Sequence, residues 1–314
     1  MTKVSVIGAG NWGKNLIKTF NQLGVLDSIV ELNLSIRKQM IQDYPDITVY
    51  DNVDTILNSG IDAVAITTPV ATHFALAEQF LRAGIDVFVE KPIAISVEET
   101  RKLADLAASS GNILMTGHLL LYQPAIKFIH DYLNSGELGK IFCLHMERKN
   151  FGTVRSFENV MWSLGVHDIA VMVYLLGGAP MKISSHGHCG LQPNIQDSVY
   201  LSLHFPENVL AHLHNSWLWH EKVRCTTVIG EHGILVYDEL KQTVTLHKKL
   251  FSSDLVPTDD GQEQIFSGSN QPLQAELEHF IYCIQTRETP ISGSANALAV
   301  IKVLEQAQIQ LEKA

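Results

Sequence analysis

Apolar residues in the first third of the chain follow two alternating patterns. Short continuous apolar runs at 4–7, 63–66 and 87–89 have the length of buried strands. Between the runs, apolar residues recur at helical spacing, as in Leu16, Ile17, Phe20 and Leu23. Gly24 and Gly84 follow two such segments, and glycine often ends a helix in the left-handed conformation. Repeated strand and helix units predict an α/β domain with a parallel sheet.

After about residue 120 the pattern changes. Apolar and polar side chains alternate from 198 to 205, which is typical of an antiparallel strand with one buried face. The segment 252–271 is rich in Ser, Asp, Gly and Gln and predicts a long surface loop, whereas helical spacing predicts a last helix over 296–312. The length also exceeds what one hydrophobic core usually serves. We therefore expect two domains, 1–120 and 121–314.

Composition narrows the functional classes. The formal charge of -10 gives no sign of a basic face for nucleic acid or for an anionic membrane. No signal-peptide pattern opens the sequence, and no apolar run reaches the roughly 20 residues of a spanning helix. The four cysteines form no CxxC pair, and the closely spaced histidine pairs lack an obvious third ligand. We expect a cytoplasmic protein without a metal site and without nucleic-acid or membrane partners.

A glycine-rich sequence follows the first predicted strand. Gly8, Gly10 and Gly13 form a GxGxxG sequence, with Asn11 and Trp12 before the last glycine. At a strand-to-helix turn, such glycines allow the tight turn, the approach of a pyrophosphate and close helix packing, while the helix N-terminus favours the phosphate charge. The context predicts a dinucleotide site. A turn that needs glycine only for its backbone conformation is the alternative.

An acidic residue has the spacing expected for ribose recognition. Glu31 lies eighteen residues beyond Gly13, at the end of the second apolar run. A carboxylate there can accept hydrogen bonds from the adenosine ribose and repels the 2′-phosphate of NADP, so the sequence predicts NAD as cofactor. Arg37 lies close in sequence and keeps NADP open as the less favoured cofactor. A solvated Glu31 without a ligand role is the other alternative.

Five motifs together resemble the glucose-fructose oxidoreductase, inositol dehydrogenase and MocA family. In chain order they are Gly8 to Gly13, Thr68-Pro69 with His73, Glu90-Lys91-Pro92, Gly139-Lys140-Ile141 and Gly165-Val166-His167-Asp168. The resemblance implies an α/β Rossmann domain followed by an α+β domain with a large, open, mostly antiparallel sheet. It also implies association through that sheet into a homodimer or homotetramer. To the cofactor site it adds Thr68, Pro69, His73, Glu90 and Lys91.

The same resemblance implies the catalytic residues. Lys91 is expected to reach toward the nicotinamide and the reacting hydroxyl, where an ammonium stabilises the alkoxide that develops as hydride leaves carbon. His167 is the expected general base, because imidazole titrates near neutral pH. Ser163, four residues earlier and on the same predicted helical face, stands where many family members carry aspartate. Because proline follows Lys91, the sequence allows either a cis or a trans peptide bond between Lys91 and Pro92.

The segment from Glu158 to Ile169 resembles a branch of the family that acts on UDP-N-acetylglucosamine or its uronate. The segments 117–122 and 216–218 are similar to that branch as well. This resemblance adds to the substrate site, beside Lys91 and His167, the residues Tyr122, Ser163, Lys222 and Arg224. The last two alternate in a predicted strand, so they are expected to point the same way, toward a diphosphate or carboxylate. Two solvated charges on an outer sheet face are the alternative.

The resulting prediction is an NAD-dependent dehydrogenase that converts the 3-hydroxyl of a nucleotide sugar to a ketone. One alternative is a dehydrogenase of a free cyclitol or monosaccharide. Another is a regulator that binds dinucleotide and sugar without turnover. The presence of Lys91 and His167 argues for catalysis, whereas Ser163 in place of aspartate keeps the regulator open.

Overall fold

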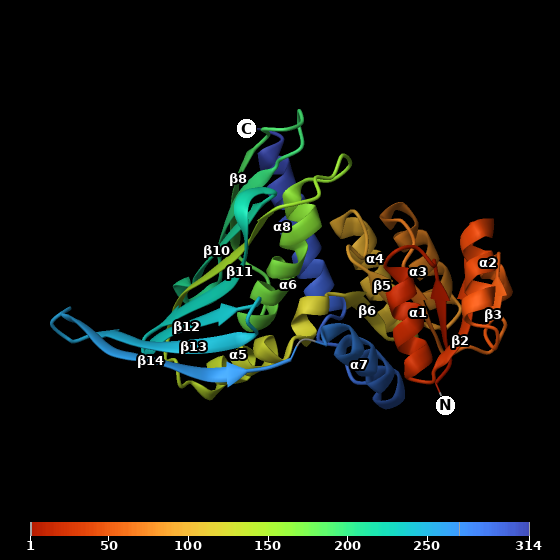
Figure 1. The fold of residues 1–314 in the computed structure, drawn as a ribbon, viewed down its shortest axis with the longest axis horizontal. Helices are drawn as coiled ribbons and strands as arrows, with labels where there is room; N and C mark the ends of the chain where they lie inside the picture. Colours follow the sequence, from red (N-terminus) through yellow and green to blue (C-terminus); the bar gives the residue numbers. More distant parts are fainter. Residues whose placement is uncertain (1, 270, 314) are drawn as a thin grey trace. The chain divides into compact units, whose positions relative to one another are not determined.

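The computed structural model describes residues 2–269 and 271–313 and divides them into two compact units (Figure 1). The first contains the chain up to Leu119 together with Pro272–Ile301. The second contains Leu120–Gln271 and the residues from Lys302 onward. The expected domains were 1–120 and 121–314; the chain passes from the first unit to the second at Leu119–Leu120, and Pro272–Ile301 returns to the first unit.

The first unit is built on a parallel sheet, which in the described residues has six strands in the order β3-β2-β1-β4-β5-β6. The strands are β1 (Val4–Ile7), β2 (Leu26–Val30), β3 (Thr48–Tyr50), β4 (Ala63–Ile66), β5 (Asp86–Glu90) and β6 (Leu114–Gly117). The connecting helices are α1 (Gly13–Gln22), α2 (Leu34–Asp43), α3 (His73–Arg82) and α4 (Val97–Ser110). The central strands β1 and β4 are buried along their whole length, as continuous apolar runs require. The predicted Rossmann domain is confirmed.

The return of the chain to the first unit has a packing reason. Helix α7 (Pro272–Thr286) places Phe280 edge-on against Phe88 of β5, with ring centroids 5.7 Å apart. Just beyond α7, the Arg287 guanidinium lies 2.7 Å from the buried carboxylate of Asp86. Aromatic burial and a partly buried ion pair thus fix this segment to β5. An apolar helical pattern alone does not specify which core it will join.

The second unit contains a sheet whose described part has eight strands, in the order β14-β13-β12-β11-β7-β10-β9-β8. The strands are β7 (Ile141–Phe151), β8 (Lys182–His188), β9 (Ser198–His204), β10 (Leu210–Ser216), β11 (Leu218–Gly230), β12 (Gly233–Asp238), β13 (Thr243–Phe251) and β14 (Pro257–Ser267). The pair β7 and β10 is parallel, and the other pairs are antiparallel. The large, mostly antiparallel sheet is confirmed, and β9 shows the predicted alternation of buried and more exposed residues.

Helices cover one face of this sheet. They are α5 (Pro124–Ser135), α6 (Val166–Leu175) and the end of α8 (Ser294–Leu311), which begins in the first unit (Figure 1). The hydroxyl of Ser185 on β8 donates to the Ala307 carbonyl of α8 at 2.9 Å. The last helix thus lies close to the range predicted from its spacing, 296–312. Within the described residues, no helix is both long and apolar enough to cross a membrane.

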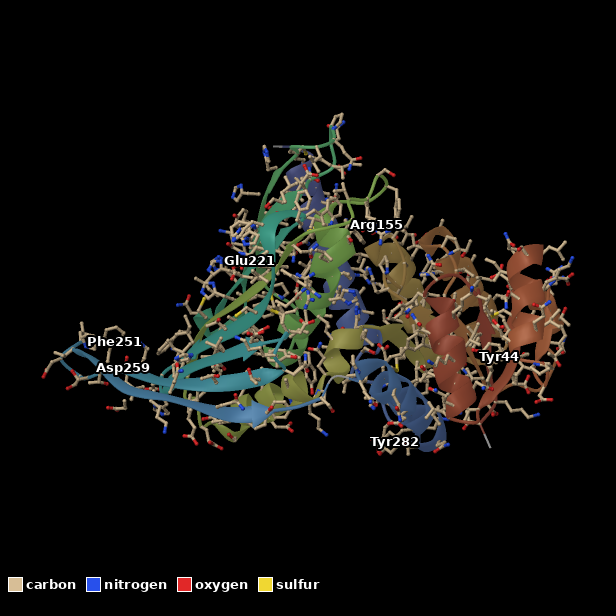
Figure 2. All side chains as sticks on the ribbon, in the orientation of Figure 1. Tyr44, Arg155, Glu221, Phe251, Asp259 and Tyr282 are labelled. Carbon is tan, nitrogen blue, oxygen red and sulfur yellow. The ribbon has the colours of Figure 1, made fainter. Side chains whose placement is uncertain are left out.

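The prediction of a surface loop over 252–271 is wrong. Strands β13 and β14 form a hairpin joined at Ser252–Val256, and its outer part bears Phe251 and Asp259 (Figure 2). Cross-strand ion pairs support it: Lys249 lies 2.9 Å from Asp259, and Lys248 lies 3.0 Å from Glu263. Most of β14 is exposed, so it lacks the apolar alternation that identifies a half-buried strand.

Candidate functional site

The glycine turn between β1 and α1 has the shape of a dinucleotide-binding turn. Gly8 has a φ of +97°, which favours glycine, and a Cβ on Gly13 would lie 2.2 Å from the Gly8 carbonyl oxygen. A Cβ on Gly10, in contrast, would meet no atom within 4 Å. Gly8 and Gly13 therefore allow close packing of the turn, whereas Gly10 faces open space that a ligand can fill.

A cavity of about 670 Å³ lies beside this turn, entirely within the first unit. Of the expected cofactor residues, its lining includes Gly8, Gly10, Glu31, Thr68 and Pro69. Asn33, Ile36 and Val53 also line the cavity. The lining is mainly apolar with one carboxylate, as an adenosine site requires.

Glu31 is held in place by backbone donors. It is 9% exposed, and its two carboxylate oxygens accept hydrogen bonds from the N–H groups of Ala9 and Asn33, each at 2.7 Å. The side chain thus connects the glycine turn to the N-terminus of α2. Two charge-assisted bonds fix the carboxylate at the cavity wall, where its remaining lone pairs can accept from ribose hydroxyls.

Arg37 is engaged by the protein itself. Its guanidinium donates to the backbone carbonyl of Glu31 at 3.0 Å and lies 3.6 Å from the carboxylate of Asp51. These contacts use donors that a 2′-phosphate would need. Arg37 is therefore tied to the backbone of Glu31 and to the segment after β3.

The turn and the cavity fit a nicotinamide dinucleotide. No side chain caps the start of α1 at Trp12, so the helix N-terminus faces the turn without a competing acceptor. The residues that would hold the cofactor are Gly8, Gly10, Glu31 and Thr68 around the adenosine half. Bound there, the nicotinamide supplies a hydride acceptor.

Glu90 ends β5 and links the glycine turn to the Glu-Lys-Pro segment. The Trp12 indole donates a hydrogen bond to Oε1 of Glu90, and the backbone N–H of Lys91 donates to Oε2 at 3.2 Å. The peptide bond between Lys91 and Pro92 is cis, the geometry left open by the sequence. Lys91 is half-buried at the carboxyl end of a parallel strand, where ligands bind in such sheets.

His73 has a different environment from the one expected of a cofactor contact. It is buried, and its ring nitrogens lie 2.8 Å from the Pro92 carbonyl and 2.7 Å from the Thr68 carbonyl. Burial lowers the pKa of this imidazole, while the two carbonyls act in the opposite direction. His73 thus ties the segment after β4 to the segment after β5.

Thr67 is a residue of this site that the sequence reasoning missed. Its hydroxyl donates to the Gly8 carbonyl at 2.7 Å and lies 2.6 Å from where a Cβ of Gly13 would be. Thr67 therefore fills the space that the two glycines leave. Its position directly before Thr68-Pro69, at the end of an apolar strand, was the available signal.

In the second unit, His167 lies at the start of α6, directly after one turn of π-helix over Met161–Gly165. Ser163 lies within that wide turn, so the regular four-residue spacing assumed for Ser163 and His167 is interrupted. Both side chains are half-buried. A Cβ on Gly165 would lie 2.3 Å from Oδ1 of Asn215, so Gly165 allows the Asn215 side chain to approach this turn closely.

Asp168 anchors a buried polar network that sequence reasoning did not foresee. Its carboxylate accepts hydrogen bonds from Arg148 at 2.8 Å and from Asn215 at 3.0 Å, and Arg148 also pairs with Glu239 at 2.6 Å. Although burial disfavours a charged guanidinium, the two carboxylates raise the pKa of Arg148 above its usual range. The network joins β7, β10, α6 and the segment after β12, and so fixes the helix that carries His167.

The remaining expected substrate residues have unequal surroundings. Tyr122 is buried in a short 3₁₀ helix, and Lys222 is exposed in a stretch where the pairing of β11 with β7 is irregular. Arg224 is half-buried and donates to the Lys149 carbonyl at 2.9 Å and to Oδ1 of Asn150 at 2.6 Å. Lys222 and Arg224 therefore do not form an equivalent pair, because regular strand alternation does not hold between Leu218 and Val223.

Comparison with known families agrees with this architecture. Residues 2–118 match the family described as an oxidoreductase family with an NAD-binding Rossmann fold, and residues 126–236 match the GFO/IDH/MocA C-terminal domain. Together these matches cover more than half of the chain. The fold and the glycine turn define an oxidoreductase with an NAD-binding Rossmann domain. The chain belongs to the GFO/IDH/MocA family.

Several relatives are similar over most of the chain. UDP-N-acetylglucosamine 3-dehydrogenase of Acidithiobacillus ferrooxidans is 24% identical, over 99% of this chain and 97% of its own. Its solved structure covers the same shares, with a TM-score of 0.88. The NAD(+)-dependent scyllo-inositol 2-dehydrogenase of Bacillus subtilis is 26% identical, over 81% of this chain and 76% of its own. At these identities the structural likeness shows the shared fold.

Proposed function

We propose that this protein is an NAD-dependent dehydrogenase that oxidises a ring hydroxyl of a sugar derivative to a ketone. The observation that carries the proposal is the fixed Glu31 carboxylate beside the open glycine turn. A carboxylate held by two backbone donors favours ribose hydroxyls and disfavours a 2′-phosphate. Family membership supports oxidation as the reaction.

We assign separate roles to two side chains in the reaction. Lys91 holds the reacting oxygen and stabilises the negative charge that develops on it. His167 accepts the hydroxyl proton, and the Asp168 network keeps its helix in one position. Ser163 is uncharged, so the positive charge that His167 gains has no carboxylate partner at that position.

The favoured substrate is UDP-N-acetylglucosamine or its uronate, oxidised at the 3-hydroxyl. Support comes from the resemblance of 158–169 to that branch and from the full-length match to a UDP-N-acetylglucosamine 3-dehydrogenase. We assign Lys222, which is exposed and forms no ion pair with the described residues, to the diphosphate. Arg224 supports the same region through its contacts with Lys149 and Asn150.

A cyclitol dehydrogenase is the second candidate. The match to scyllo-inositol 2-dehydrogenase favours it, as does the use of the Arg224 guanidinium by protein acceptors. The test is NAD reduction, followed by absorbance, with UDP-N-acetylglucosamine, its uronate, free N-acetylglucosamine and inositol as substrates. Faster turnover of the UDP-sugars supports the first candidate, and faster turnover of inositol supports the second. Dinucleotide and sugar binding without any turnover would instead indicate a regulator.

We also propose that copies of the chain associate through the face of the second sheet that lacks helices. A cavity of about 560 Å³ lies on that face, lined in part by His145, Tyr200 and His214. The Tyr200 and His214 rings stack with centroids 4.0 Å apart, and Lys149 lies 3.9 Å from the ring centre of Trp219. Such aromatic surfaces are common in subunit interfaces. Light scattering after size exclusion should give a dimer or tetramer, and Tyr200→Glu should reduce it to a smaller species.

A further inference from the structure

Two acidic side chains, one half-buried and one buried, act on each other in the first unit, and the expected cofactor residues include one of them. Glu90 ends β5, and Glu276 lies in α7 with 1% of its surface exposed. Oε1 of Glu276 has no hydrogen-bond partner among the described residues. Burial raises the pKa of Glu276 well above its usual value, and the charge of Glu90 acts in the same direction.

Contacts on three sides fix Glu90. The Trp12 indole and the Lys91 backbone N–H donate to its two oxygens. On a third side, Gly117 of β6 lies so close that a Cβ there would be 2.9 Å from Oε2. Glu90 is therefore held between the glycine turn and Lys91, with Glu276 as a second acid nearby.

Two carboxylates that act on each other, one of them fully buried, disfavour a double negative charge at neutral pH. Burial raises the pKa of Glu90 to about 7, although the Trp12 and Lys91 donors and the Lys91 charge act against it. His118, the other titratable group near Lys91, is buried, and burial lowers its pKa to about 3. The neighbouring element α1 contributes the indole of Trp12, which does not titrate. Glu90 thus changes charge near neutral pH while Glu276 keeps its proton.

The position of Glu90 in the sheet relates it to the nicotinamide half of the cofactor. The cavity beside Glu31 is lined by residues that follow β1, β2 and β4, whereas Glu90 ends β5, the next strand beyond β4. A dinucleotide bound across such a sheet places its two halves on the two sides of the switch point. The nicotinamide ring is positive when oxidised and neutral when reduced, so a carboxylate on that side distinguishes the two forms.

We propose that Glu90 is a titratable charge that favours oxidised over reduced dinucleotide, and that Glu276 is a positioning residue that stays neutral beside it and limits the water around it. This inference rests on the proposed binding of NAD. It assigns a role to Glu276, a residue that the sequence analysis did not single out.

The first test compares the affinities of the wild-type protein for NAD⁺ and NADH by calorimetry between about pH 6 and pH 8. The preference for NAD⁺ over NADH should rise by roughly tenfold as Glu90 loses its proton. This factor corresponds to a difference of one unit between the Glu90 pKa values in the two complexes. Glu90→Gln should make this preference independent of pH. Glu98→Gln, a change at an exposed residue of α4, is the matched control and should behave as wild type.

Variants of Glu276 separate its neutral form from a charged one. Glu276→Gln imitates the protonated acid and should leave the midpoint of the pH transition within about one unit of the wild-type value. Glu276→Ala opens space for water beside Glu90, so the midpoint should move to lower pH. A Gln variant with a midpoint more than about one unit lower would show that Glu276 is charged, which overturns the inference.

A direct measurement separates this inference from the proposed function. Infrared absorption of protonated carboxylic acid, measured without dinucleotide at about pH 8, where Glu90 is largely ionised, should show a buried acid that is absent from Glu276→Gln. If NAD fails to bind but the acid band is present, the proposed function fails and the acid pair stands. Absence of the band, a flat NAD⁺ to NADH preference, or a pH dependence that persists in Glu90→Gln overturns the inference.

Discussion

Glu31→Gln offers the sharpest test of cofactor choice. The wild-type carboxylate accepts from two backbone N–H groups at 2.7 Å, whereas an amide has only one oxygen to offer them. The amide nitrogen must therefore face one N–H donor, which should cost about 1–3 kcal/mol of folding stability. The change also removes the negative charge beside the ribose site. Like charges about 5 Å apart repel by about 3 kcal/mol at an effective dielectric constant near 20.

The wild-type protein should therefore bind NAD more tightly than NADP by roughly 5-fold to 150-fold, which corresponds to about 1–3 kcal/mol. Glu31→Gln should lose most of that ratio and should also unfold at lower urea concentration. Calorimetry with both dinucleotides measures the ratio, and Asp51→Asn, a change at an exposed partner of Arg37, is the control. Equal wild-type affinities, or an unchanged ratio in Glu31→Gln, would refute the reasoning and direct attention to Arg37.

Other variants test catalysis, stability and substrate choice. Lys91→Ala and His167→Ala should each lower turnover by roughly 100-fold or more, while His167→Ala keeps dinucleotide affinity; steady-state kinetics and calorimetry measure the two effects. Arg148→Met should cost about 3–5 kcal/mol of unfolding free energy in urea titrations, because it leaves the Asp168 carboxylate buried without its cation. Lys222→Ala should lower kcat/KM for a UDP-sugar but not for inositol, since inositol lacks the diphosphate.

Each of these expectations has a contrary outcome. Near-normal turnover in His167→Ala would move the role of base to Tyr122 or a bound water. An Arg148→Met protein within about 1 kcal/mol of wild type would show that the network contributes little to stability. Unchanged UDP-sugar kinetics in Lys222→Ala, together with better turnover of inositol, would reject the nucleotide sugar while the oxidoreductase remains.

Local sequence signals predicted the first unit well because its chemistry is local. The glycine turn, Glu31 and the Glu-Lys-Pro segment each depend on residues adjacent in sequence and on their place at a strand end. The Ser96 cap of α4 was likewise foreseeable from spacing, and its side chain accepts from the Glu99 N–H at 3.2 Å. Contacts made by backbone groups, such as the hydrogen bond from the Asn33 N–H to Glu31, cannot be read from residue types, because almost every residue has the same N–H group.

In the second unit, several features could not be predicted from local sequence signals. Arg148, Asp168 and Glu239 meet through pairings between segments far apart in sequence, and the register of a sheet decides which charges become neighbours. The hairpin of β13 and β14 was missed because solvent reaches both of its faces, so polar residues occur at both strand positions. Asn215 approaches Gly165 in the π-helical turn before α6, which is again a contact between distant segments.

Glu31 and Glu90 lie at the same edge of the first sheet but have different surroundings. Combining variants of the two acids tests both proposed roles. The neighbours of Glu31 include two backbone donors, whereas Glu90 lies near a second buried carboxyl group, Glu276. Glu31→Gln should therefore change the NAD to NADP ratio but leave the pH dependence of the NAD⁺ to NADH ratio intact. Glu90→Gln should do the reverse, and the double variant should show the sum of the two effects, because the sites share no hydrogen-bond partner among the described residues. A strong departure from additivity would mean that the two halves of the dinucleotide site are coupled, through the glycine turn that contacts both acids.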